Sequence, residues 1–358
     1  MVEDLGYYPF GSAEFSNMVH YVRSGDFVHE LLLESADVNE YAFSLGALAH
    51  YASDITGHSM AVNQAVAIEY PKLRVKFGKS VTFAEDRTAH LKTEFGFDMI
   101  QVSKNRYASQ QYHDFIGFKV SKPLLERAFP VVYGLELKDV LAHEDLAIGS
   151  YRFFVSRMIP EMTQVALQTH KKDMMRERPD FAKKQFLYRL SRSDYEKEWG
   201  KDYAKPGFGT RILSTLLRYM PRVGPFKGLG FKNPTPQTED LYFKSINLTV
   251  DQYRTFLRAA GTNSLLLANC NLDSGQVTKA AEYSLTDDTY AKFLAQLSER
   301  KFDRVSPELR ANILQFYSDL SAPIDTKKNQ VRWQGVLAAL DQLKAATPVP
   351  VVTSNSAQ

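Results

Sequence analysis

Residues 43–58 read FSLGALAHYASDITGH, and this stretch decides which fold we expect around it. His50, Asp54 and His58 lie four residues apart, so on an α-helix they project from one side in a row. A helix rises about 1.5 Å per residue, which puts His50 and His58 about 12 Å apart along its axis. One zinc ion cannot bind both imidazoles, because zinc–nitrogen bonds are about 2.0–2.1 Å long. If both histidines are ligands, there are at least two metal ions.

The residues before this stretch favour a long helix. Asp37 has the side chain of a good N-cap residue. Tyr41, Leu45 and Leu48 follow at spacings of four and three, which predicts a buried apolar stripe. We therefore expect a helix from Asp37 to about Ala67.

A second histidine–carboxylate pair, His90 and Glu94, has the same i, i+4 spacing. We expect it on a helix over about residues 86–102. The predicted apolar stripe of this helix is Leu91, Phe95 and Val102. A single pair of this kind is usually a surface hydrogen bond, but two pairs favour metal binding. Packed against the first helix, the second pair would complete a site with His58.

The composition limits the kinds of site that the chain can hold. Its 358 residues include one cysteine, Cys270, which excludes an intramolecular disulfide and a thiolate zinc cluster. Ligands without sulfur are typical of catalytic zinc. The net charge of +3 is too small to indicate a nucleic-acid partner. The chain has no apolar run of about 18 residues, so we expect no transmembrane segment.

Helical patterns continue through the rest of the chain. We expect helices over about 121–145, 147–170 and 329–345. Thr249 and Gln252 fit a capping box for a helix that ends at Gly261, and Ser306 caps a helix that begins at Pro307. Residues 265–285, with the turn Asp273-Ser274-Gly275, are interpreted as a small hairpin.

Residues 43–54 look like the central metal helix of bacterial zinc-dependent phospholipase C proteins, and His90 to Glu94 resembles the later His-x-x-x-Glu motif of that family. The resemblance is specific over about residues 1–100. It implies an all-α, multi-helical core with three zinc ions. We expect residues 1–170 to form the phospholipase C-like domain, 171–345 a mostly helical accessory region, and 346–358 a disordered tail.

The resemblance implies a role for each matching residue. Asp4 resembles an aspartate on the first zinc and is the candidate general base or water-orienting group. His20 resembles the next ligand, and His50 and Asp54 complete that first site. His58, His90 and Glu94 would hold the second zinc, and Asp54 would bridge to a third. The implied catalytic residues are Asp4 and Asp54, and the implied metal ligands are Asp4, His20, His50, Asp54, His58, His90 and Glu94.

Other polar residues compete for these roles. His29 is the main competitor for His20. Asp26 and Asp98 are either carboxylates that orient ligand imidazoles or ordinary surface residues. His113 is interpreted as structural.

The chain departs from the family pattern in two respects. The second-site histidine of the family lies six residues after the helix aspartate, whereas His58 lies four after Asp54. The third zinc of the family uses an N-terminal tryptophan and an early histidine, which have no counterpart here. We therefore expect two zinc sites, an incomplete third site and an N-terminally truncated chain. The family's phospholipases are exported, but we see no signal peptide in this sequence.

Residues 203–238 contain six basic residues and no acidic one, interleaved with apolar side chains. The basic residues are Lys205, Arg211, Arg218, Arg222, Lys227 and Lys232. Such a segment is able to lie on an anionic membrane surface. The alternative is an ordinary helix that packs its apolar face on the core.

The expected function is a zinc-dependent phosphoesterase that hydrolyses a phosphodiester such as a phospholipid head group. One alternative is a nuclease-like phosphohydrolase, which needs aromatic platforms for bases; the 12% aromatic content permits these but does not locate them. The other is a non-catalytic zinc-binding scaffold, if the chain truly starts at Met1.

Overall fold

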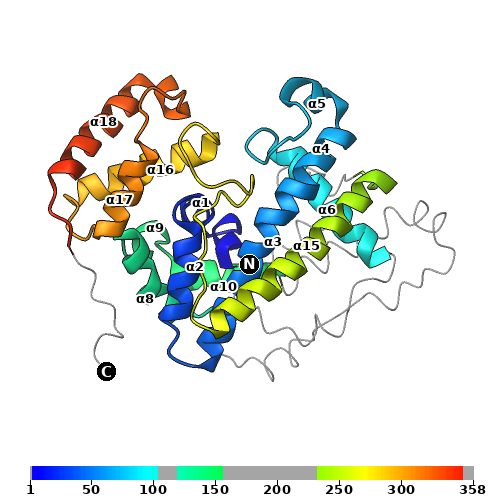
Figure 1. Ribbon diagram of the computed structural model, residues 1–358, viewed down its shortest axis with the longest axis horizontal. Coiled ribbons are helices and arrows are strands. Elements are labelled where there is room, and N and C mark those ends of the chain that lie inside the picture. The colour runs from blue at the N-terminus through cyan, green and yellow to red at the C-terminus, as the bar shows by residue number, and fades with distance from the viewer. Residues whose placement is uncertain (1, 104–118, 156–231, 350–358) are drawn as a thin grey trace.

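The computed structural model describes residues 2–103, 119–155 and 232–349, and the regular elements in these ranges are helices (Figure 1). The prediction of an all-α fold is therefore confirmed. The predicted hairpin over 265–285 reduces to a single antiparallel bridge between Cys270 and Val277. The small hairpin is thus present in a minimal form, with two backbone hydrogen bonds across it, from Asn271 to Gln276 and from Thr278 to Asn269.

The central element is α3 (Val38–Gly57), which runs without a break through the π turn η2 (His58–Val62) into α4 (Asn63–Glu69). The carboxylate of Asp37 caps this helix by accepting hydrogen bonds from the backbone N–H groups of Asn39 and Glu40. The predicted helix is thus confirmed. Tyr41, however, is 38% exposed, and the predicted stripe is wrong at this position. Leu48 is buried as predicted, and Ser44 lies on the buried face in place of Tyr41.

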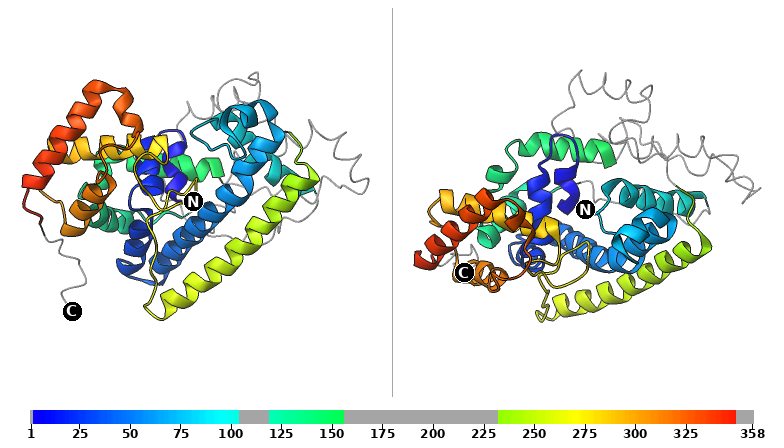
Figure 2. Two further views of the ribbon diagram at one scale, coloured as in Figure 1. Left: turned by 45° about the horizontal axis from the view of Figure 1, so that its top comes forward. Right: turned by 90° about the horizontal axis from the view of Figure 1, so that it is seen from above.

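A second long helix, α15 (Pro236–Gly261), lies beside α3 in all three ribbon views (Figures 1 and 2). The hydroxyl of Tyr253 donates to the carbonyl of Leu45, 3.0 Å away. The helix ends at Gly261 as predicted, but it begins at the Thr235 cap, so the predicted capping box at Thr249 is wrong. Thr249 lies inside the helix, where its hydroxyl bonds to that of Thr56.

The main core joins the two ends of the chain. It contains η1 (Val2–Tyr7), α1 (Ala13–Tyr21), α2 (Ser24–Leu33), α8 (Lys122–Tyr133), α9 (Leu137–Val140), α10 (Glu144–Phe153), α16 (Ser284–Glu299), α17 (Pro307–Phe316) and α18 (Gln330–Ala345). The short 3-10 helix η6 (Asp325–Lys328) connects the last two. Ser306 caps α17 as expected, and α18 follows the predicted range, with Asn329 as its N-cap. The predicted helix over 121–145 is interrupted at Gly134, whose positive φ of 65° ends α8.

A smaller apolar cluster joins α4 to α6 (Arg87–Ser103), with α5 (Pro71–Phe77) at its edge. Ala89, His90 and Phe97 are the buried side of α6. Leu91 is 42% exposed, so the predicted apolar stripe of this helix is wrong at this position. The helix turns its histidine face inward, and Leu91, the next residue, therefore points away from the core.

Several predictions concern residues outside the described ranges. These are the helix over 147–170 beyond residue 155, the division at residues 170–171, most of the basic segment 203–238, the tail from residue 350, and His113. Among the helices that the structure describes, none is long and apolar enough to span a bilayer.

The segment before α16 is bonded directly to the N-terminal helices. The hydroxyl of Ser24 donates to the carbonyl of Cys270 at 2.5 Å and accepts from its N–H at 3.1 Å. The hydroxyl of Tyr51 donates to the carbonyl of Ala268, and the N–H of Leu272 donates to the carbonyl of His20. Residues 268–272 are thereby fixed against α1, α2 and α3.

We expect Ser24→Ala to lower the free energy of unfolding by about 1–3 kcal/mol, because it leaves two buried backbone groups of Cys270 without their partner. Urea unfolding followed by circular dichroism measures this. Ser298→Ala, at an exposed hydrogen bond, is the control and should cost less than about 0.5 kcal/mol. Equal effects of the two substitutions would contradict the prediction.

Candidate metal centre

One group of convergent side chains combines Asp4, His20 and His50, whose ligand atoms lie within 4.8 Å of one another. They come from η1, α1 and α3. The Nε2 atom of His20 is 3.5 Å from Asp4 and 3.6 Å from Asp54. The Nε2 atom of His50 is 3.1 Å from Asp54. Two imidazoles and two carboxylates therefore face the same point.

The orientation of His20 is fixed by its own helix. Its Nδ1 atom lies 2.7 Å from the carbonyl oxygen of Ser16, one turn earlier on α1. Since a carbonyl accepts, Nδ1 carries a proton, and Nε2 is the nitrogen that faces Asp4 and Asp54 and would bind a metal. This arrangement is common for metal-binding histidines, whose second nitrogen donates to a carbonyl or carboxylate.

A second group lies one turn further along the central helix. The Nε2 atoms of His58 and His90 are 3.2 and 3.1 Å from the same oxygen of Glu94. The Nδ1 atom of His58 is 3.3 Å from the carboxylate of Asp273. Asp273 is buried, with 2% of its surface exposed. The ligand atoms of His58, His90 and Asp273 lie within 4.8 Å of one another.

His50 belongs to the first group and His58 to the second, as expected from their separation along the helix axis. His58 is the first residue of the π turn η2. Turns of this kind insert an extra residue into a helix and often occur at functional sites. The turn closes with a hydrogen bond from the N–H of Asn63 to the carbonyl of His58.

Asp273 was not predicted as a site residue. The sequence marked it as part of a turn, Asp273-Ser274-Gly275, and its nearest partner in the site is far away in the chain. No helical spacing links it to His58 or His90. Its proximity depends on how the loop before α16 docks onto α1, α3 and α4.

The remaining candidates lie elsewhere. Asp26 accepts from Arg23 at 2.6 Å and from Asn269 at 3.1 Å. His29 lies on α2, and it is His20 that faces Asp4. Asp98 is exposed on α6.

The polar atoms in both groups fit a metal better than they fit each other. The buried atoms His50 Nε2, His58 Nδ1, His90 Nδ1 and Asp273 Oδ1 have no well-directed hydrogen bond, although each site is full of polar groups. Unpaired polar atoms in a buried site are costly. Imidazole nitrogens and carboxylate oxygens without sulfur are the donors that zinc takes in catalytic sites. The side chains present therefore suit zinc.

Charge pairing dominates the first group. Burial lowers the pKa of His20, but Tyr7, Asp4 and Asp54 outweigh burial and hold it well above its ordinary value. Burial raises the pKa of Asp54, but the histidines around it hold its pKa well below the ordinary range. The Asp54 carboxylate is thus ionised, and the His20 imidazole is held in its protonated, positively charged form.

The second group follows the same pattern. Burial lowers the pKa of His58, but Asp54, Asp273 and Glu94 raise it well above its ordinary value. Burial raises the pKa of Asp273 and of Glu94, but the pKa of each is lowered overall by His58 and His90. A cation at this position would replace the proton that the His58 imidazole otherwise holds.

Both groups face one cleft with a volume of about 730 Å³. Besides the seven predicted ligands and Asp273, it is lined by Tyr7, Tyr8, Tyr21, Phe83, Arg87, Thr88 and Leu91. Among these described lining residues, Arg87 is the one with a permanent positive charge. Its guanidinium carbon lies 5.2 Å from the centre of the Phe83 ring.

Residues 1–142 match the family model described as zinc dependent phospholipase C. Neither the curated proteins nor the solved structures gave a match to the chain. The matched segment contains all seven predicted ligands, from Asp4 to Glu94, whereas Asp273 lies far beyond its end.

We expect zinc and pH to act together on stability. In the metal-free chain, the raised pKa of His20 and His58 means that protonated imidazoles stabilise the fold. This contribution is complete below the unfolded-chain pKa of about 6.5 and is lost as the pH rises through the raised folded value. Zinc requires neutral imidazoles, so its stabilisation grows over the same rise.

The measurement is thermal unfolding of the chelator-treated and zinc-loaded chain between about pH 6 and pH 9, the range in which imidazoles lose their protons. The difference between the two melting temperatures should widen as the pH increases. A difference that stays constant or narrows would contradict the prediction.

Proposed function

We propose that the chain is a zinc-dependent phosphoesterase that hydrolyses the head-group phosphodiester of phospholipids, because residues 1–142 match the zinc-dependent phospholipase C family model. The observation that carries the proposal is that two histidine–carboxylate groups face a single cleft. Sites with two nearby metals suit phosphate-ester hydrolysis because both the attacking and the leaving oxygen need stabilisation.

Each predicted ligand has a defined place in this proposal. Asp4, His20, His50 and Asp54 would hold one zinc, and His58, His90 and Glu94 the other. Zinc bound there would polarise the phosphoryl oxygens and lower the pKa of a bound water. A third zinc is not required by this proposal.

Asp4 is the proposed general base. Burial raises its pKa, but His50 and His20 lower it overall, so the carboxylate is ionised at neutral pH. Its side chain is about one-third exposed, unlike that of Asp54, and it therefore has access to a water in the cleft. Asp4 would accept a proton from the attacking water, and the products would be a phosphomonoester and an alcohol.

The cleft lining favours a lipid over a nucleic acid. Tyr7, Tyr8, Phe83 and Leu91 supply apolar surface next to the acidic and histidine groups. An exposed leucine beside the site suits the glycerol and acyl region of a lipid better than a charged backbone. Arg87 is placed to bind a phosphoryl oxygen, since guanidinium groups pair well with phosphates. Export of the protein, as in the family's phospholipases, remains part of the proposal.

We expect His50→Ala and Asp54→Ala to remove bound zinc and to lower kcat/KM by more than about a hundredfold, because each takes away a ligand. Zinc content is measured by ICP-MS, and activity by release of phosphomonoester from phosphatidylcholine vesicles. The matched control is His143→Ala, an exposed histidine at the start of α10.

The outcomes distinguish the candidate functions. Activity retained in either ligand variant would contradict the proposal. Zinc bound by the wild type without hydrolysis would favour a non-catalytic zinc-binding scaffold. Hydrolysis of single-stranded DNA in place of phospholipid would favour the nuclease-like alternative.

We expect Arg87→Gln to lower kcat/KM by about tenfold to a hundredfold, the loss of one charged hydrogen bond to the phosphate. Zinc content should not change, because Arg87 is not a proposed ligand. Arg87→Lys should retain part of the activity. Arg74→Gln, at an exposed arginine on α5, is the control. Equal activity of Arg87→Gln and wild type would exclude this role.

A further inference from the structure

Asp273 is a buried carboxylate that the proposed reaction does not use, and it belongs to a part of the chain outside the matched segment. We propose that Asp273 is a positioning residue that orients His58 for the second zinc, so that the loop 271–275 completes this metal site. The inference rests on the proposed function in one respect, namely that His58, His90 and Glu94 bind zinc.

The two nitrogens of His58 have different neighbours. Its Nε2 atom lies 3.2 Å from Glu94, and the Nε2 atom of His90 lies 3.1 Å from the same oxygen. Its Nδ1 atom lies 3.3 Å from Oδ1 of Asp273. These two buried atoms face each other and make no well-directed hydrogen bond to any other group. A proton on Nδ1 turned toward Asp273 would leave the lone pair on Nε2 directed at the position between His90 and Glu94. A carboxylate that accepts from a ligand imidazole fixes its tautomer and its ring orientation.

The other oxygen of Asp273 is already occupied. Oδ2 accepts from the hydroxyl of Tyr283 at 2.6 Å and from the N–H of Phe83 at 3.0 Å. These two bonds hold the carboxylate plane and leave Oδ1 for His58. Oδ1 is 4.0 Å from His90, which is further than its distance to His58. The geometry therefore favours an acceptor of the His58 proton over a direct ligand.

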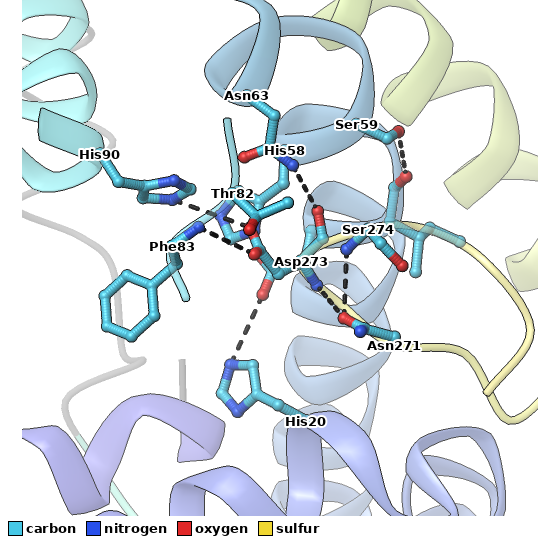
Figure 3. A network of polar contacts seen from close by, with 12 residues as sticks. His20, His58, Ser59, Asn63, Thr82, Phe83, His90, Asn271, Asp273 and Ser274 are labelled. Atoms are coloured by element: carbon cyan, nitrogen blue, oxygen red, sulfur yellow. Dashed lines mark hydrogen bonds and ion pairs between the residues drawn. The ribbon is translucent and has the colours of Figure 1, made fainter. Parts of the chain in front are cut away.

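The loop itself is fixed by bonds to the site helices (Figure 3). Asn271 accepts from the N–H groups of Asp273 and Ser274, which closes a tight turn. Asn63, just after the π turn, donates to the carbonyl of Asp273 at 2.8 Å. The position of the carboxylate is thus determined by backbone as well as side-chain contacts.

Gly275 allows this close approach. Its φ is +71°, and a Cβ atom there would lie 2.4 Å from the carbonyl oxygen of Ile55. The loop therefore packs against the backbone of α3 one turn before His58. Only glycine combines the positive φ with this contact at no steric cost.

The experiment is a zinc titration of the full chain in competition with a chromophoric chelator. His90→Ala identifies which binding step belongs to the second site. In Asp273→Asn we expect that step to weaken by about tenfold to a hundredfold, while the first step is unchanged and both zincs are still bound at saturation. Tyr283→Phe, which removes one bond to Oδ2, should weaken the same step by less.

The matched control is Asp287→Asn. Asp287 is also buried and accepts from the N–H groups of Ala281 and Asp325, away from the cleft. It should lower stability without changing either zinc step. The visible spectrum of the cobalt-substituted chain should change in Asp273→Asn and stay the same in Asp287→Asn, because a purely structural role does not alter the ligand field.

Each outcome bears on the inference. If the second zinc-binding step has the same affinity in Asp273→Asn as in the wild type, the inference is overturned. If Asp273→Asn lacks the second zinc-binding step even at saturating zinc, as expected for His90→Ala, the inference is overturned and Asp273 is a direct zinc ligand. Equal weakening in Asp287→Asn would overturn it in favour of general destabilisation. A wild type that binds no zinc would refute the proposed function itself, which is a different result from any of these.

Discussion

The buried pairing of imidazoles with carboxylates is the constraint on which the rest of this structure depends. Four histidines and four acidic residues converge where η1, α1, α3 and α6 meet the loop before α16. They are His20, His50, His58, His90, Asp4, Asp54, Glu94 and Asp273. Asp54 and Asp273 are the deeply buried carboxylates, and an isolated carboxylate at that depth is strongly destabilising. The fold must therefore bring a compensating positive charge, carried by protons or by a metal, to each of them.

The helices accommodate this constraint at a local cost. The central helix would continue smoothly from α3 to α4, but a π turn begins at His58. On α6, His90 is directed inward and Leu91 is left exposed beside the cleft. An exposed leucine is unfavourable for the isolated chain, yet it becomes useful if the cleft receives an apolar substrate. Both irregularities lie at the second group.

The part of the site that depends on helical spacing was predictable from the sequence. His50, Asp54 and His58 share one face of a capped helix, and His90 and Glu94 share another, so periodicity alone places them. Tyr41 and Leu91 were assigned to the wrong face because periodicity identifies a stripe but not which neighbour covers it. Thr249 was mistaken for a cap because its spacing to Gln252 also occurs inside a helix. Asp273 had no local signal, since its role depends on loop docking.

The docking of that loop links metal binding to the folding of the second half of the chain. Residues 268–275 bond to Ser24, Tyr51, Asn63 and the backbone of His20. Any ligand that binds the folded state alone stabilises it, and the stabilisation extends to every segment that must be ordered for binding. If Asp273 orients His58, zinc at the second group stabilises the docked loop, and the docked loop strengthens zinc binding by the same free energy. The segment that matches the family would then not bind metal independently, because His58 would depend on a residue more than a hundred positions beyond the end of that segment.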